Sequence, residues 1–156
     1  MSKLEEKVGY ALDLYTLLYG LSIKTIKEKY GQEAIEMLKK VFFERGKELG
    51  KQEVKRLKIK DMNAKGYHII VKAALDSFGI KHRVLELSEE KYVLQIFDCP
   101  HGVRFKNLNA PPEVCDILLE LDRGIVEALN PKLEFKLTKH ILRGDKYCEY
   151  VVKPKD

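Results

Sequence analysis

The sequence predicts a single α+β domain, in which N-terminal helices pack on an antiparallel sheet made of two hairpins with a helix between them. Apolar residues recur three and four positions apart in the first half of the chain, and they alternate with polar residues in two later stretches. The length of 156 residues suits one hydrophobic core. We therefore expect residues 1–156 to form one domain, without internal repeats or an interdomain linker.

The first half of the chain predicts three helical segments. A stripe of apolar residues from Leu4 to Leu18 predicts a helix that stops near Gly20. A short second helical segment is expected to end or kink at Gly31. The apolar positions of residues 32–57 predict a long third helical segment.

Gly46 and Gly50 lie four residues apart within the predicted long helix. Each costs up to about 1 kcal/mol of helix propensity relative to Ala, so we expect something to approach the backbone there. The favoured interpretation is another helix that packs tightly, and the alternative is a ligand lying in the groove.

The middle of the chain predicts a capped helix followed by a hairpin. Asp61 or Asn63 can cap the helix, which ends at Gly79. The apolar period then becomes two over residues 81–87 and 91–99, which is typical of a β-hairpin.

The last third of the chain predicts a loop, a helix and a second hairpin. Residues 100–110 are expected to form the loop, and the prolines before Glu113 open a helix that ends at Asn130. Alternation over residues 133–142 and 147–152 predicts the closing hairpin.

The formal net charge of +5 raises the question of an anionic partner. The basic residues of 39–60 alternate with acidic and apolar ones on a predicted helix, which favours a solvated face over a nucleic-acid surface. Many Lys and Glu with few Asn and Gln are typical of thermophile proteins. The chain lacks a signal-peptide pattern and an apolar run of ~20 residues, so we expect a cytoplasmic protein without a membrane partner.

The cysteines are the strongest chemical feature of the sequence. An odd number in this setting argues against a disulfide framework. The three cysteines Cys99, Cys115 and Cys148 lie near structural transitions together with His101 and His140, and these five residues could supply the four ligands of a zinc ion. The alternative is that they are inert core residues.

Two local features sharpen the zinc prediction. Cys115 lies in the first turn of a predicted helix, where we expect the helix N-terminus to lower its thiol pKa. A hairpin turn with an odd number of residues would bring His140 and Cys148 to one face, whereas a two-residue turn at Gly144-Asp145 would remove His140 as a ligand.

The segment of about residues 43–152 resembles the 4-vinyl reductase domain family. The residues that carry the resemblance are Gly46-Lys-Glu-Leu-Gly50, Gly79-Ile80, Cys115 and His140-Ile-Leu-Arg-Gly-Asp-Lys-Tyr-Cys148. The resemblance implies a structural zinc held by Cys115, Cys148 and His140, which stands where the family has Cys. The family's Glu would fall at Leu137, which cannot bind zinc, so Cys99 is our replacement and His101 the reserve. The resemblance also implies that the domain encloses a small, largely hydrophobic ligand between its helices and its sheet. Regulatory members of the family sense such ligands.

The same resemblance guides two further expectations. Relatives pair as dimers, and residues 1–30, outside the resemblance to residues 31–156, are the natural dimerising element. A ligand pocket is expected at five apolar or aromatic residues, whose alternative role is ordinary core packing: Tyr67, Ile70, Ala74, Phe78 and Phe97.

A second set of residues is similar to the L-2-amino-thiazoline-4-carboxylate hydrolase-like proteins: Cys99-Pro100, Cys115, Asp122, Asn130-Pro131 and Gly144-Asp145-x-x-Cys148. Asp122, seven residues after Cys115, is expected near the same helix face. This resemblance implies the alternative function, hydrolysis of a small cyclic or amide substrate by a metal-bound water or by Cys115 as nucleophile. Four protein ligands on the metal would favour a structural role, and three would favour catalysis.

Overall fold

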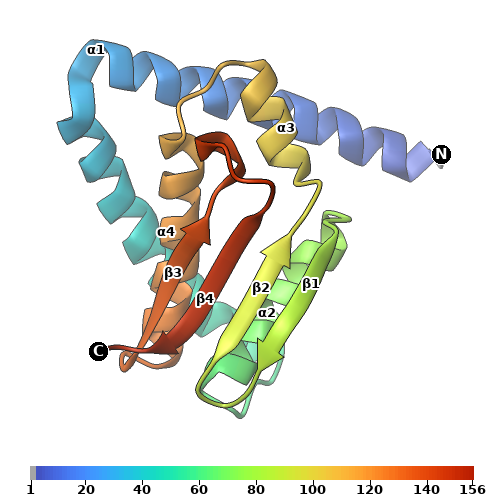
Figure 1. Cartoon of the computed structure of the whole chain (residues 1–156), viewed down its shortest axis with the longest axis vertical. Coiled ribbons are helices and arrows are strands. Elements are labelled where there is room, and N and C mark those ends of the chain that lie inside the picture. The colour runs from blue at the N-terminus through green and yellow to red at the C-terminus, as the bar shows by residue number, and fades with distance from the viewer. Residues whose placement is uncertain (1–2) are drawn as a thin grey trace.

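The computed structural model describes residues 3–156 and shows the predicted α+β fold (Figure 1). Its elements are α1 (Lys3–Arg56), α2 (Ala64–Ser77), β1 (His82–Leu87), β2 (Tyr92–Ile96), α3 (Pro100–Asn107), α4 (Glu113–Leu129), β3 (Leu133–Lys139) and β4 (Cys148–Pro154). None of the helices within residues 3–156 is both long and apolar enough to cross a bilayer.

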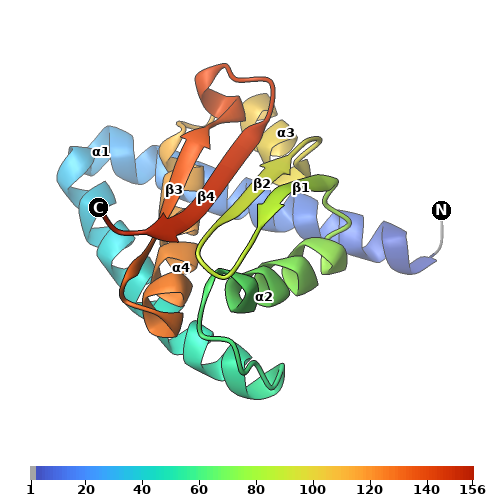
Figure 2. The ribbon, with the colours of Figure 1, turned by 60° about the horizontal axis from the view of Figure 1, so that its bottom comes forward.

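The sheet has the antiparallel strand order β1-β2-β4-β3, so the two predicted hairpins join through β2 and β4 (Figure 2). Tyr92 and Leu94 of β2 pair with Val152 and Tyr150 of β4. These four side chains therefore share the face of the sheet that packs on the helices.

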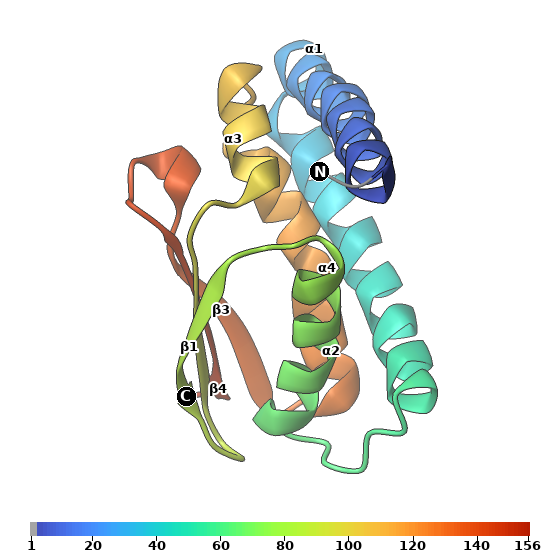
Figure 3. The same ribbon diagram turned by 90° about the vertical axis from the view of Figure 1, so that its right-hand side faces the viewer.

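The molecule has three layers, which Figure 3 shows from the side. The sheet forms the first layer, α2 and α4 cover its inner face, and α1 lies behind α4. The main hydrophobic core lies between the sheet and α2 and α4, and a smaller core joins α1, α3 and α4.

Helix α1 bends once, at Gly31, where φ is 75° and ψ is −166° (Figure 1). The predicted kink is confirmed, and the predicted stop at Gly20 is wrong. Gly20 is buried against Phe105 of α3, where a Cβ would lie 3.2 Å from the ring. A small residue at this position serves helix contact and does not end the helix.

Helices α1 and α4 meet at backbone distance. A Cβ on Gly46 would collide with the backbone of Leu121, and a Cβ on Gly124 would collide with the carbonyl of Phe43. The glycines at positions 46 and 50 thus accommodate another helix, which confirms the favoured interpretation.

The capping and hairpin predictions hold in the middle of the chain. The side chain of Asn63 caps α2 by accepting from the backbone of Lys65 at 3.0 Å, and Gly79 follows the helix with φ at 63°. Strands β1 and β2 form the first hairpin, with a bulge between Val84 and Glu86.

Two connections differ from the predictions. The expected loop at residues 100–110 contains α3, which begins at Pro100 and whose N-cap Cys99 accepts from the backbone N–H of Gly102 at 3.4 Å. The turn between β3 and β4 is no tight hairpin turn. It contains a 3-10 helix (Ile141–Arg143) and closes through Gly144 at φ 101°.

Candidate functional site

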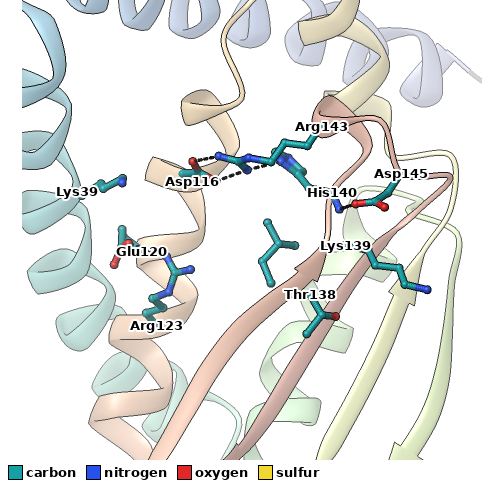
Figure 4. A pocket seen from close by; sticks show the side chains of 10 residues that line it. Lys39, Asp116, Glu120, Arg123, Thr138, Lys139, His140, Arg143 and Asp145 are labelled. Atoms are coloured by element: carbon teal, nitrogen blue, oxygen red, sulfur yellow. Dashed lines mark hydrogen bonds and ion pairs between the residues drawn. The ribbon is translucent and has the colours of Figure 1, made fainter.

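A charged groove of about 410 Å³ opens between α1, α4 and the end of β3 (Figure 4). Its volume falls in the range of small-molecule sites. It is lined by Lys39, Asp116, Glu120, Arg123, Leu137, Thr138, Lys139, His140, Arg143 and Asp145.

A three-residue network joins α4 to the connection between β3 and β4. The guanidinium of Arg143 donates to both carboxylate oxygens of Asp116, at 2.9 and 2.6 Å. It also lies 2.6 Å from Nδ1 of His140 (Figure 4). Since arginine only donates, Nδ1 accepts and the histidine proton is on Nε2.

His140 is therefore held as a neutral ring. Burial and the charge of Arg143 both lower its pKa. Its Nε2 is buried and has no hydrogen-bond partner among residues 3–156. The backbone N–H of His140 donates to the carboxylate of Asp145 at 2.7 Å, which fixes the start of the connection.

A second polar centre lies in the interior, beneath the sheet. The Tyr67 hydroxyl of α2 donates to Oδ1 of Asp122 of α4 at 2.7 Å. Burial raises the pKa of Asp122 to about 6, against the opposing effects of Tyr67 and Arg123. The Tyr92 hydroxyl is buried nearby without a partner in the described part of the chain. Its pKa is raised by burial and by Asp122.

Tyr150 of β4 connects this centre to the cysteines. Burial raises its pKa, and the charges of Cys148, Cys99, Asp122 and Cys115 act in the same direction. The phenol therefore lies within electrostatic range of three thiols and a carboxyl group. The sequence analysis did not single out this tyrosine.

These interior residues are deep but not fully covered. Burial is the largest cause of the raised pKa of Asp122, Tyr150 and Cys115, yet each keeps part of its surface accessible. By contrast, Leu94 and Val152, on the same face of the sheet as Tyr150, are completely covered. Asp122, Tyr150 and Cys115 thus keep more accessible surface than these apolar neighbours.

The cysteines are free thiols, and the predicted lowering of the Cys115 pKa is wrong. Burial raises the pKa of Cys115, and the other two thiols add to the effect. Burial also raises the pKa of Cys148 to about 11. In the interior, desolvation outweighs the attraction of the helix N-terminus for a thiolate.

The predicted zinc ligands do not fit a metal site as they are arranged. Within residues 3–156, no three His, Cys, Asp or Glu side chains approach closely enough to hold a metal ion. His140 contacts the cation of Arg143. The reserve ligand His101 packs its ring against Tyr15 and Phe78. Zinc remains a prediction from the sequence, and no chemical step is derived from it.

The five predicted pocket residues do not form one surface. Tyr67 and Ile70 are buried in the main core, whereas Ala74 of α2 and Phe78, which follows that helix, are exposed. Phe97 is half-buried on another part of the sheet, where its ring lies 5.5 Å from that of Tyr147.

Asp116, Arg143 and Tyr150 are among the site residues that the sequence analysis missed. Asp116 and Arg143 pair across 27 positions, and no local pattern marks such a pair. Tyr150 carried a usable signal, because it alternates with Cys148 on the last strand and so shares its face.

The chain belongs to the L-2-amino-thiazoline-4-carboxylic acid hydrolase family, whose model matches residues 13–152. The match begins within the predicted N-terminal extension of residues 1–30. It supports the second of the two resemblances, whereas the 4-vinyl reductase resemblance stays a prediction. The comparison with curated proteins finds no match.

Two solved structures share the fold. A trafficking protein particle complex subunit 3 from Naegleria fowleri, covalently bound to palmitic acid, matches with a TM-score of 0.68 and 19% identity over 94% of this chain and 96% of that one. The phenol-responsive sensory domain of the transcription activator PoxR, with phenol, matches with a TM-score of 0.63 and 18% identity over 89% and 74%.

Proposed function

We propose that this domain binds a small molecule between α4 and the inner face of the sheet, against Asp122 and Tyr150. One observation carries the proposal: these side chains are deep enough for burial to dominate their pKa values, yet they keep accessible surface. Deep groups with accessible surface support a space between α4 and the sheet that a small ligand would fill. A binding site between helices and a sheet is of the kind that small ligands occupy.

The charged groove is the path from this space to solvent. Leu137 lines the groove and also packs against the main core. Leu137 pairs with Tyr150 on the neighbouring strand. A ligand that passes Leu137 therefore arrives beside the Tyr150 phenol.

The residues define the chemistry of the ligand. Apolar side chains of the main core surround a small number of hydrogen-bonding groups, which are the Asp122 carboxyl and the Tyr67, Tyr92 and Tyr150 hydroxyls. This combination suits a mostly apolar molecule with one hydroxyl or carbonyl group. The phenol and the palmitic acid of the two structural relatives are of this kind, which supports the proposal.

Native mass spectrometry and calorimetry with phenol and palmitate test the proposal. We expect a co-purified small molecule or saturable binding of one of these probes. Asp122→Asn and Tyr150→Phe should weaken binding about tenfold, because each removes a buried hydrogen bond or its charge. Asp98→Asn, at an exposed position, is the control. A chain that carries no small molecule and binds neither probe would contradict the proposal.

Hydrolysis of a small cyclic or amide substrate is the second candidate function. The family supports it, and Asp122 has a pKa of about 6, which suits a general base near neutral pH. Cys115 does not suit the role of nucleophile, because burial raises its thiol pKa.

Ring opening of L-2-amino-thiazoline-4-carboxylic acid tests this second candidate. We expect turnover that is lost in Asp122→Asn and kept in Cys115→Ser. Equal turnover in the wild type and in Asp122→Asn would exclude Asp122 as the base, and no turnover in the wild type would leave binding as the function.

A further inference from the structure

The Tyr92 hydroxyl of β2 lies inside the main core without a partner. The residue is 0% exposed, and no group of residues 3–156 forms a hydrogen bond with its hydroxyl. Buried hydroxyl groups are nearly always bonded, either to protein or to an ordered water. The unpaired hydroxyl therefore indicates a bonding group that the chain itself does not supply.

The Asp122 carboxylate of α4 has bonding capacity left over. Tyr67 of α2 donates to its Oδ1 at 2.7 Å, and Tyr67 is the only residue of the described chain that donates to this carboxylate. Because the pKa of Asp122 is about 6, the carboxylate is mostly ionised at pH 8, and an ionised carboxylate only accepts hydrogen bonds. Its second oxygen, Oδ2, is therefore free to accept from a further donor.

Tyr92 and Asp122 lie near each other without a direct bond. Tyr67, which donates to Asp122, also packs its ring edge-on against that of Tyr92, with 6.0 Å between the ring centroids. The charge of Asp122 raises the pKa of Tyr92, so the Tyr92 hydroxyl lies within the field of the carboxylate. The three residues come from β2, α2 and α4, which meet where the two helices cover the sheet (Figure 3). An unpaired donor and an open acceptor are thus gathered in one part of the core.

This combination discriminates between ligand groups. A hydroxyl accepts from Tyr92 and donates to Oδ2 of Asp122. A carbonyl or ether oxygen also accepts from Tyr92, but it has no proton for Asp122 and turns its lone pairs towards the carboxylate. An ammonium group donates to Asp122 but leaves the Tyr92 proton without an acceptor.

An anionic ligand group meets further opposition. The cation beside Asp122 is Arg123, whose charge lowers the pKa of Asp122. Arg123 already pairs with Glu120, at 2.6 Å. A ligand carboxylate would therefore face the charge of Asp122 where burial makes charge costly, without a free cation to offset it.

We propose that the interior site selects a hydroxyl group, which accepts a hydrogen bond from Tyr92 and donates one to Asp122. This selectivity rests on the proposed binding function, and it narrows the ligand to apolar alcohols and phenols. Water also donates and accepts, so the ligand hydroxyl replaces a water molecule between the two residues.

Calorimetry at pH 8 with ring compounds of similar size tests the selectivity. We expect phenol to bind about tenfold more tightly than anisole, which lacks the proton for Asp122, and more tightly than toluene and benzylamine. Benzoate should not bind measurably. The pair of 1-decanol and decanoate makes the same comparison for a longer ligand, and the alcohol should bind more tightly.

The outcomes separate this proposal from the function on which it rests. If anisole, toluene, benzylamine or benzoate binds as tightly as phenol, or decanoate as tightly as 1-decanol, the site binds small molecules without selecting a hydroxyl. If none of these compounds binds, the proposed function itself is wrong.

Tyr92→Phe tests the donor. It should weaken phenol and anisole binding alike, by about tenfold, and leave toluene binding unchanged, because both oxygens accept from Tyr92. The ligand-free variant should be no less stable to urea, since the deleted hydroxyl has no partner. Tyr19→Phe is the matched control, because the Tyr19 hydroxyl donates to the Val114 carbonyl at 2.9 Å in the smaller core; it should keep every affinity. A Tyr92→Phe protein that binds phenol like the wild type would overturn the proposal.

Asp122→Asn tests the acceptor. Tyr67 continues to donate to the amide oxygen, so the amide NH₂ group takes the position of Oδ2 and donates instead of accepting. We expect the preference for phenol over anisole to disappear. An Asp122→Asn protein that keeps the full preference would exclude Asp122 as the acceptor.

Discussion

Asp122 is the residue at which the interior responds to pH. Its pKa of about 6 lies above the ordinary value of 3.8, so the folded state binds this proton more tightly than the unfolded state. The ionised carboxylate consequently destabilises the fold at neutral pH, and this cost is relieved as the pH falls through 6 towards 4. The shift corresponds to about 3 kcal/mol at most.

Urea unfolding at several pH values checks this effect. We expect Asp122→Asn to be more stable than the wild type at pH 7 and the two to converge near pH 4, because the asparagine has no charge to bury. Asp98→Asn, at an exposed position, should run parallel to the wild type. A constant difference between Asp122→Asn and the wild type from pH 4 to 8 would contradict the raised pKa.

The thiols give a second prediction at the residue scale. With a pKa of about 11, Cys148 is almost entirely neutral at pH 8. Since only the thiolate reacts, we expect alkylation of the folded protein to be at least a hundredfold slower than that of free cysteine, and to become fast in urea.

Metal analysis distinguishes two states of the cysteines: neutral thiols, or ligands of the zinc ion that the sequence predicts. The protein is prepared under reducing conditions without chelator. The zinc prediction requires about one equivalent per chain, which Cys148→Ser would lower together with the melting temperature. If the protein contains no metal and its thiols still react slowly, the zinc prediction is wrong.

At the scale of elements, the contact between α1 and α4 leaves no room for a side chain. Gly124→Ala would place a Cβ against the Phe43 carbonyl, and we expect a loss of about 1–3 kcal/mol in the free energy of unfolding. Gly9→Ala is the matched control, because no atom lies within 4 Å of its added Cβ. That change should stabilise the protein by up to about 1 kcal/mol. Equal effects of the two substitutions would refute the close approach.

The elements that the sequence predicted well are those with a strong local pattern. Helix α4 has prolines before its start and a regular apolar stripe, and β2 alternates. Helix α3 was missed because its eight residues carry only a short pattern, and its cap is a cysteine, an unusual capping residue. The connection after β3 was predicted as a tight turn, but Arg143 in this connection pairs with Asp116 of α4. A contact between residues so far apart in the sequence leaves no local pattern.

For the whole molecule, the order of helices and strands was enough to predict the α+β class, whereas the site was predicted only in part. The charges of the cysteines and Asp122 all act on Tyr150 of the last strand, whose face periodicity defines. The predicted ligand residues stay a prediction, because periodicity identifies a buried face without saying what fills the space opposite. Cytoplasmic location and thermophilic origin stay predictions, since a fold does not record them.

The glycine contact between α1 and α4 connects the proposed ligand site to the outer layer of the molecule. Asp122 lies on α4 between Leu121 and Gly124, and α4 meets α1 there without an intervening layer of side chains. Since no side chains lie between the two helices to absorb a movement, we expect a ligand that displaces α4 to displace α1 as well. By linkage, anything that holds α1 in place would then change the affinity of the interior for phenol.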